Sequence, residues 1–141
     1  MSDKKCVVIV EDDPDARDYL TAILEDNGYE PVTAADGEEG LQKVRERKPA
    51  VILLDLMMPK KSGMKFLNEI KQDEELKSIP IVVESGASAV TGVDMRKYLE
   101  DPPYRDRKAK ALGMDIDITP DAYLEKPVDP DMLVEILKKL A

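Results

Sequence analysis

Short, almost wholly apolar runs alternate with amphipathic helical segments along this 141-residue chain. Strands that are apolar at nearly every position are typical of parallel sheets covered on both faces, and parallel neighbours need a crossover connection that is usually helical. The alternation therefore predicts an α/β fold: a five-stranded parallel sheet, doubly wound, with helices on both faces. The predicted strands lie at residues 6–10, 31–34, 51–54, 79–83 and 122–124.

Local signals mark the ends of the predicted helices. Asp13 and Pro14 are typical of a helix start, and Asn27–Gly28 supplies a stop. The second helix has acidic residues at its start and basic residues at its end, which suits the helix dipole. A third is expected at about 64–71, and the last begins at Asp129–Pro130.

The connection between the fourth and fifth strands is unusually long. It runs from Gly86 to Pro120, which exceeds one helix and its turns. Thr91–Glu100 and Tyr104–Leu112 are predicted helices, separated by two prolines, and alternation over 114–119 suggests extended chain. We expect residues 1–141 to form one domain with an inserted or extended segment at about 86–120.

Composition excludes several classes of function. The net charge of −9 argues against a nucleic-acid surface, because phosphates would be repelled. Histidine is absent, so the chain cannot use it as a metal ligand or general base, and the single Cys6 excludes an internal disulfide. No apolar run approaches the length of a membrane span, and no signal-peptide core appears near the N-terminus. We therefore expect a cytoplasmic protein that contacts no membrane.

Charged residues follow three of the predicted strands. Glu11 and Asp12 follow the first, Asp55 follows the third and Lys126 follows the fifth, while Ser85 follows the fourth. Carboxyl ends of neighbouring parallel strands converge on one crevice. Three carboxylates there repel one another unless a cation binds or their pKa values rise. Taken singly, these residues are typical of turns and helix caps; together they predict a divalent metal beside a carboxylate able to attack phosphorus.

Four short motifs occupy these strand ends in order, and together they resemble the receiver domains of bacterial two-component response regulators. The resemblance covers nearly the whole chain outside the long segment, and it implies a flavodoxin-like fold and a phosphoprotein. The motifs are Val10-Glu11-Asp12-Asp13-Pro14, Asp55-Leu56-Met57-Met58-Pro59, Val83-Glu84-Ser85-Gly86 and Tyr123-Leu124-Glu125-Lys126-Pro127.

The resemblance implies a role for each site residue. Asp55 is the expected phosphoacceptor. Mg²⁺ is expected on Asp12, on Asp55 and on the backbone carbonyl of Met57, with Glu11 acting largely through water.

The same resemblance implies the parts of a switch. Ser85 is the expected switch hydroxyl, Tyr123 the rotating aromatic residue and Lys126 the phosphate-binding ammonium.

The function implied is a single-domain signalling switch in a phosphorelay. A sensor histidine kinase or a phosphotransfer protein is the expected phosphodonor, and an unknown downstream protein is expected to bind the surface around the fourth and fifth strands. Beyond promoting its own phosphorylation and dephosphorylation, the protein is not expected to be an enzyme.

Two other classes of function remain as alternatives. An aspartate-nucleophile phosphohydrolase shares this chemistry, but such enzymes usually place a second acid two residues after the nucleophile, where Met57 stands here. A flavodoxin-like cofactor binder needs a phosphate-binding loop rich in Ser, Thr and Gly after the first strand, where this chain is acidic.

Glu84 is an unusual residue for the end of an apolar strand. If Ser85 faces the phosphorylation site, alternation along the strand directs Glu84 toward the helices that cover the sheet. A carboxylate buried there should be protonated or paired, with Arg96 and Lys97 as the leading candidates. The alternative is that the strand ends earlier and that Glu84 is solvated.

Overall fold

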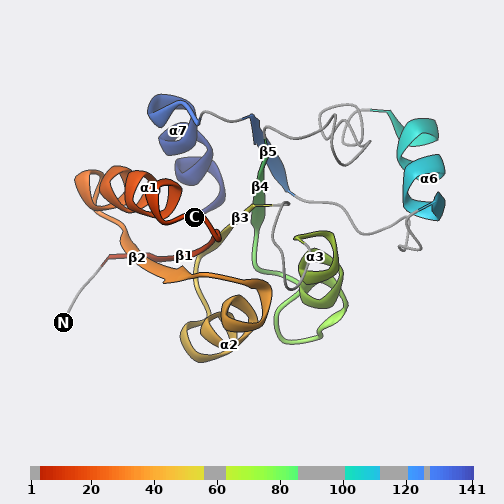
Figure 1. The fold of residues 1–141 in the computed structure, drawn as a ribbon, viewed down its shortest axis with the longest axis horizontal. Coiled ribbons are helices and arrows are strands. Elements are labelled where there is room, and N and C mark those ends of the chain that lie inside the picture. The colour runs from red at the N-terminus through yellow and green to blue at the C-terminus, as the bar shows by residue number, and fades with distance from the viewer. Residues whose placement is uncertain (1–3, 56–62, 86–100, 112–120, 126–127) are drawn as a thin grey trace.

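The computed structural model describes residues 4–55, 63–85, 101–111, 121–125 and 128–141. Five parallel strands form one sheet in the order β2-β1-β3-β4-β5, which confirms the predicted fold class (Figure 1). The strands are β1 (Cys6–Val10), β2 (Glu30–Ala34), β3 (Val51–Asp55), β4 (Ile81–Ser85) and β5 (Ala122–Glu125).

Helices cover both faces of this sheet. One face carries α1 (Pro14–Asp26) and α7 (Pro130–Leu140), and the other carries α2 (Gly37–Arg47) and α3 (Gly63–Gln72) (Figure 1). Helix α6 (Pro102–Ala111) lies beyond the β5 edge of the sheet. None of the helices in the described ranges is long and apolar enough to cross a membrane.

Aspartate side chains cap three of the helices. The Asp13 carboxylate accepts from the amide of Asp15 at 3.1 Å, and Pro14 occupies the first turn of α1. Asp36 caps α2 in the same way through the amide of Glu39, at 2.9 Å. Asp129 repeats the first arrangement in α7. Each cap satisfies an amide that the first helical turn leaves without an intrahelical acceptor.

Two apolar clusters form the core, one on each face, because successive strand residues point to opposite sides. The cluster under α2 and α3 takes alternate residues of the central strands together with the helix residues Val44, Phe66 and Ile70. The cluster under α1 and α7 takes the other strand residues together with Leu20, Leu24, Leu133 and Leu137. The sheet is therefore buried on both faces, as its near-continuously apolar strands predict.

Helix α2 approaches the sheet closely at Gly40. A Cβ atom there would lie 2.7 Å from Cγ2 of Val10 and 3.2 Å from the Phe66 ring. Because real Cβ atoms essentially never approach so closely, a residue without a side chain is required at this contact.

The structure corrects three details of the predicted elements. Strand β4 begins at Ile81, not at 79; the amide of Ile81 donates to the Asp121 carboxylate at 2.8 Å, while Pro80 has no amide proton. Helix α6 begins at Pro102, not at Tyr104, because proline fits the first turn of a helix. Tyr19 shares the helical spacing of Leu20, Ile23 and Leu24, which indicates the apolar face of α1, but it is 45% exposed.

The long connection is described only in part. The predicted helix at Thr91–Glu100 and the predicted extended chain at 114–119 lie outside the described residues. Within α6, Tyr104 is buried and belongs to the apolar cluster under α2 and α3. The Arg107 guanidinium lies 5.9 Å from the centre of the Tyr104 ring, within the range of a cation–π contact.

Candidate functional site

Three carboxylates meet at the carboxyl ends of β1 and β3. Glu11 and Asp55 are buried, at 0% and 3% exposure, and Asp12 is half-buried. One oxygen from each of the three lies within 4.8 Å of the others. The register explains the meeting, because Val10 is level with Leu54, which brings the next residues of the two strands side by side. The predicted convergence of these three side chains is therefore confirmed.

The loop after β1 is held by contacts of its own. The Glu11 amide donates to the carbonyl of Ala34 at 3.0 Å, and the Glu11 carboxylate accepts from the amide of Asp13 at 3.2 Å. These bonds fix the backbone on both sides of Asp12.

Arg17, on the first turns of α1, was not among the residues predicted for the site. Its guanidinium donates to the carbonyl of Glu11 at 2.9 Å and to that of Asp12 at 3.2 Å. The guanidinium therefore lies beside the acidic cluster and holds the backbone that presents two of its members. An arginine on an amphipathic helix is usually solvated, so the sequence carries no signal for this contact.

The donor set suits a small hard cation. Carboxylate oxygens are the ligands that Mg²⁺ prefers, and three of them gathered in a largely buried crevice also need positive charge nearby. The residues present therefore fit the predicted magnesium site.

The described ranges include only some of the other predicted site residues. Ser85 is the last residue of β4, level with Glu125. Tyr123 lies on β5, level with Val83, half-buried against the cluster under α2 and α3. Met57 and Lys126 lie outside the described residues, so their predicted roles stay predictions.

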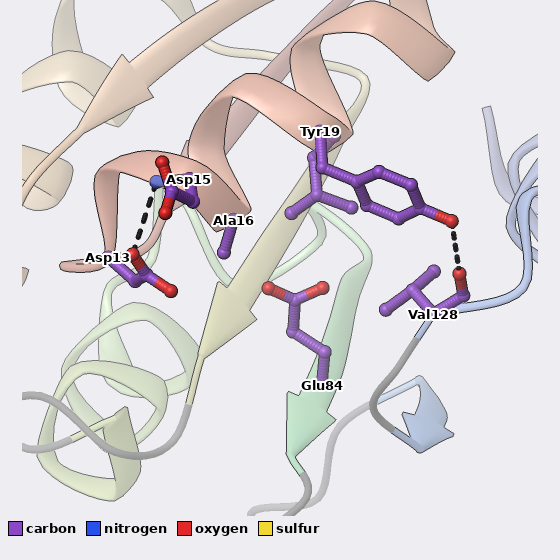
Figure 2. Close-up of a pocket in the computed structure, with 7 residues that line it drawn as sticks. Asp13, Asp15, Ala16, Tyr19, Glu84 and Val128 are labelled. Carbon is purple, nitrogen blue, oxygen red and sulfur yellow. Dashed lines mark hydrogen bonds between the residues drawn. The ribbon is translucent and has the colours of Figure 1, made fainter.

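Glu84 is buried at the end of β4, with 2% of its surface exposed. It is level with Asp55 on β3 and with Leu124 on β5. Figure 2 shows its side chain directed toward α1, as strand alternation predicts for a residue that faces the helices. The alternative of a solvated Glu84 is therefore wrong. Arg96 and Lys97 lie outside the described residues, so their pairing with Glu84 stays a prediction.

A hydrogen bond joins α1 to the chain that follows β5. The Tyr19 hydroxyl donates to the carbonyl of Val128 at 2.9 Å (Figure 2). This contact explains why Tyr19 lies at the edge of the apolar face, since its ring must reach the surface for the hydroxyl to meet that carbonyl.

Cys6 lies at the other end of β1, away from these residues. Burial raises the pKa of the Cys6 thiol; Arg47 lowers this pKa and Glu30 raises it, both by smaller amounts. Because a thiolate is the reactive form of cysteine, this position suits packing and not nucleophilic chemistry.

Comparison with known proteins gives one family. A profile described as the response regulator receiver domain matches residues 7–100. DivK, a polar-differentiation response regulator of Brucella anthropi, is 31% identical over 95% of this chain and 94% of its own length. The chain spans about half the length of other curated relatives, such as Response regulator Rre1 of Synechocystis, which is 30% identical and covered over 53%.

Solved structures agree with this family. The chemotaxis protein CheY4 of Vibrio cholerae has a TM-score of 0.72 and 28% identity, with 98% of this chain and 99% of that chain covered. The receiver domain of sensor histidine kinase PA1611 from Pseudomonas aeruginosa, with a magnesium ion coordinated in its active-site cleft, has a TM-score of 0.74. It is 22% identical, with 97% of each chain covered, and supports the fold.

Proposed function

This chain belongs to the response regulator receiver family, whose members are phosphoaccepting signalling switches, and we propose that Asp55 is its phosphoacceptor. The observation that carries the proposal is the meeting of Glu11, Asp12 and Asp55 within 4.8 Å at the strand ends. A carboxylate oxygen of Asp55 attacks phosphorus, the N–P bond of a phosphohistidine breaks, and the electron pair of that bond leaves on the imidazole.

Asp12, Asp55 and the backbone carbonyl of Met57 would hold Mg²⁺, with Glu11 acting largely through water. When bound, this ion would neutralise charge on the transferred phosphoryl oxygens. Arg17 keeps the backbone of Glu11 and Asp12 in place. Lys126 supplies a further positive charge to the phosphoryl group.

Ser85 and Tyr123 are proposed to convert phosphorylation into a change of surface. Ser85 ends β4 and Tyr123 lies on β5, so movement of the Ser85 hydroxyl toward a phosphoryl group can be felt on the neighbouring strand. The surface around β4 and β5 would then bind a downstream protein.

The proposed donor is a sensor histidine kinase or a phosphotransfer protein. The protein would promote its own phosphorylation and dephosphorylation and would catalyse no other reaction. We propose one receiver domain over residues 1–141 with an extended segment at about 86–120, in a cytoplasmic protein.

The described geometry does not favour the alternatives. A flavodoxin-like phosphate site would need free amides at the start of α1. Here Glu11 accepts from the amide of Asp13, and Asp13 accepts from that of Asp15. An aspartate-nucleophile phosphohydrolase would usually carry a second acid two residues after the nucleophile, where this chain has Met57, and the family that matches the chain is the response regulator receiver domain.

The test is intact mass after incubation with acetyl phosphate, with and without Mg²⁺. We expect one phosphoryl group on the wild-type protein only when Mg²⁺ is present, and none on Asp55→Asn. Asp12→Asn should weaken Mg²⁺ binding because it removes an anionic ligand. Asp18→Asn, an exposed acid on α1, is the matched control and should label normally. Labelling of Asp55→Asn to the wild-type extent would overturn the assignment.

A further inference from the structure

A pocket separates α1 from the end of β4. Its volume is about 480 Å³, and it lies beside the acidic cluster without including the carboxylates of Glu11, Asp12 or Asp55. Figure 2 shows it between α1, β4 and the chain after β5. Its lining residues are Asp13, Asp15, Ala16, Tyr19, Leu20, Glu84 and Val128.

The walls and the floor of this pocket differ in chemistry. Ala16, Leu20 and Val128 give it apolar walls, whereas the buried carboxylate of Glu84 points into it from the sheet. Among the described residues that line the pocket, all three charged ones are acidic. An apolar channel that ends at a carboxylate matches an aliphatic stem that ends in a cation.

We propose that this pocket binds the side chain of an arginine or lysine from the protein that presents the phosphohistidine. The proposal rests on the function proposed above and adds a recognition element to it. The stem would lie along α1 against Ala16 and Leu20, and the guanidinium or ammonium would meet the Glu84 carboxylate.

The position of the pocket favours the phosphodonor as the partner. Glu84 is level with Asp55 on the neighbouring strand, and Asp13 directly follows Asp12. A protein that brings a phosphorylated histidine to Asp55 must therefore stand against the rim of the pocket. The net charge of −9 favours a basic partner surface, and the exposed Tyr19 ring offers a contact of the kind common at interfaces.

The first experiment uses N-butylguanidinium as the probe, followed by amide NMR shifts in saturating Mg²⁺. We expect saturable shifts at Ala16, Tyr19 and Val128, and at least tenfold weaker binding to Glu84→Gln. N-Butylurea, which has the same stem and no charge, should not bind. Ala16→Leu should also weaken binding, because it narrows the pocket while leaving Glu84 in place. Asp18→Asn is the control.

Three results would overturn the proposal. Equal binding of butylurea would mean that the site selects only the apolar stem. Shifts confined to Asp12 and Asp55 would place the cation in the metal cluster. Binding that appears only after Arg96→Gln and Lys97→Gln are combined would mean that the chain's own segment is the occupant.

The second experiment separates this proposal from the function on which it rests. For each variant we would divide the rate of phosphoryl transfer from a purified histidine kinase by the rate from acetyl phosphate. The kinase used is the one that labels the wild-type protein fastest. We expect the ratio to fall at least tenfold in Glu84→Gln and Ala16→Leu and to keep its wild-type value in Asp18→Asn. An unchanged ratio in the pocket variants refutes the pocket, whereas a wild-type protein that acetyl phosphate cannot label refutes the function.

Discussion

Asp55→Asn should make the metal-free protein more stable. Glu11, Asp12 and Asp55 form three pairs of like charges within 4.8 Å, and the substitution removes two of them. At that distance and an effective dielectric constant of about 20, one ionised pair repels by ~3.5 kcal/mol. Solvent around the half-buried Asp12 and the charge of nearby Arg17 reduce this repulsion. We therefore expect the free energy of unfolding to rise by about 1–3 kcal/mol.

Magnesium should reduce the stability advantage of Asp55→Asn over the wild-type protein. At ten times its dissociation constant, Mg²⁺ adds about 1.4 kcal/mol to the stability of the wild-type protein. Asp55→Asn should gain much less, because one anionic ligand has become neutral. The difference between the two proteins should therefore narrow as Mg²⁺ is added.

The assay is urea unfolding in EDTA and again in Mg²⁺, with Asp18→Asn as the control. Asp18 is exposed on α1, so its loss should change the free energy of unfolding by less than about 0.5 kcal/mol. The reasoning from charge repulsion would be refuted if Asp55→Asn were less stable than wild type in EDTA and if Mg²⁺ raised its free energy of unfolding by as much as it raises that of the wild type.

Gly40→Ala should destabilise the protein by about 1–3 kcal/mol in urea unfolding, because its Cβ would lie 2.7 Å from Val10; equal or greater stability would contradict this. Arg17→Ala should weaken Mg²⁺ binding several-fold in a calorimetric titration, since the Glu11 and Asp12 carbonyls lose their donor. Cys6 should react with iodoacetamide at pH 8 more slowly than free cysteine, since its raised pKa leaves less thiolate, and the rate should climb as pH rises. In receiver domains, side chains two positions after the phosphoacceptor and two after the switch residue can orient the water that hydrolyses the aspartyl phosphate. Met57 and Ala87 occupy these positions and cannot hydrogen-bond a water through their side chains, so the aspartyl phosphate should decay slowly. Met57→Asn or Ala87→Glu should speed the decay measured by mass, and no change in either would contradict this.

Deleting Asp101–Lys110 would test whether the long segment binds the downstream partner. Because Tyr104 is buried in the core cluster, that deletion would also remove core packing. Arg107→Glu reverses an exposed charge of α6 and keeps the buried Tyr104 side chain, at the cost of the cation–π contact between the two residues. If the segment is the partner site, this variant should lose target binding in a pull-down and still be phosphorylated on Asp55. Loss of both would mean that α6 is structural.

The fold was predictable because each of its signals is local. Runs of apolar residues specify strands that are buried on both faces, and Asp13, Asp36 and Asp129 provide helix caps through bonds to amides two or three residues away. The meeting of Glu11, Asp12 and Asp55 was predictable too, because parallel strands bring their carboxyl ends to the same edge.

The tertiary structure decided the features that depend on partners far away in the chain. Tyr19 has helical spacing that predicts burial, yet its hydroxyl bonds to Val128, and its ring lies at the surface. How α1 packs over the sheet determines which carbonyls Arg17 contacts, and it also determines the pocket into which Glu84 points. The amino-acid sequence specifies which strand ends carry charge, since that depends on short stretches of chain. The contacts that those charged side chains make are determined only by tertiary packing, because they involve surfaces of elements that are distant in the sequence.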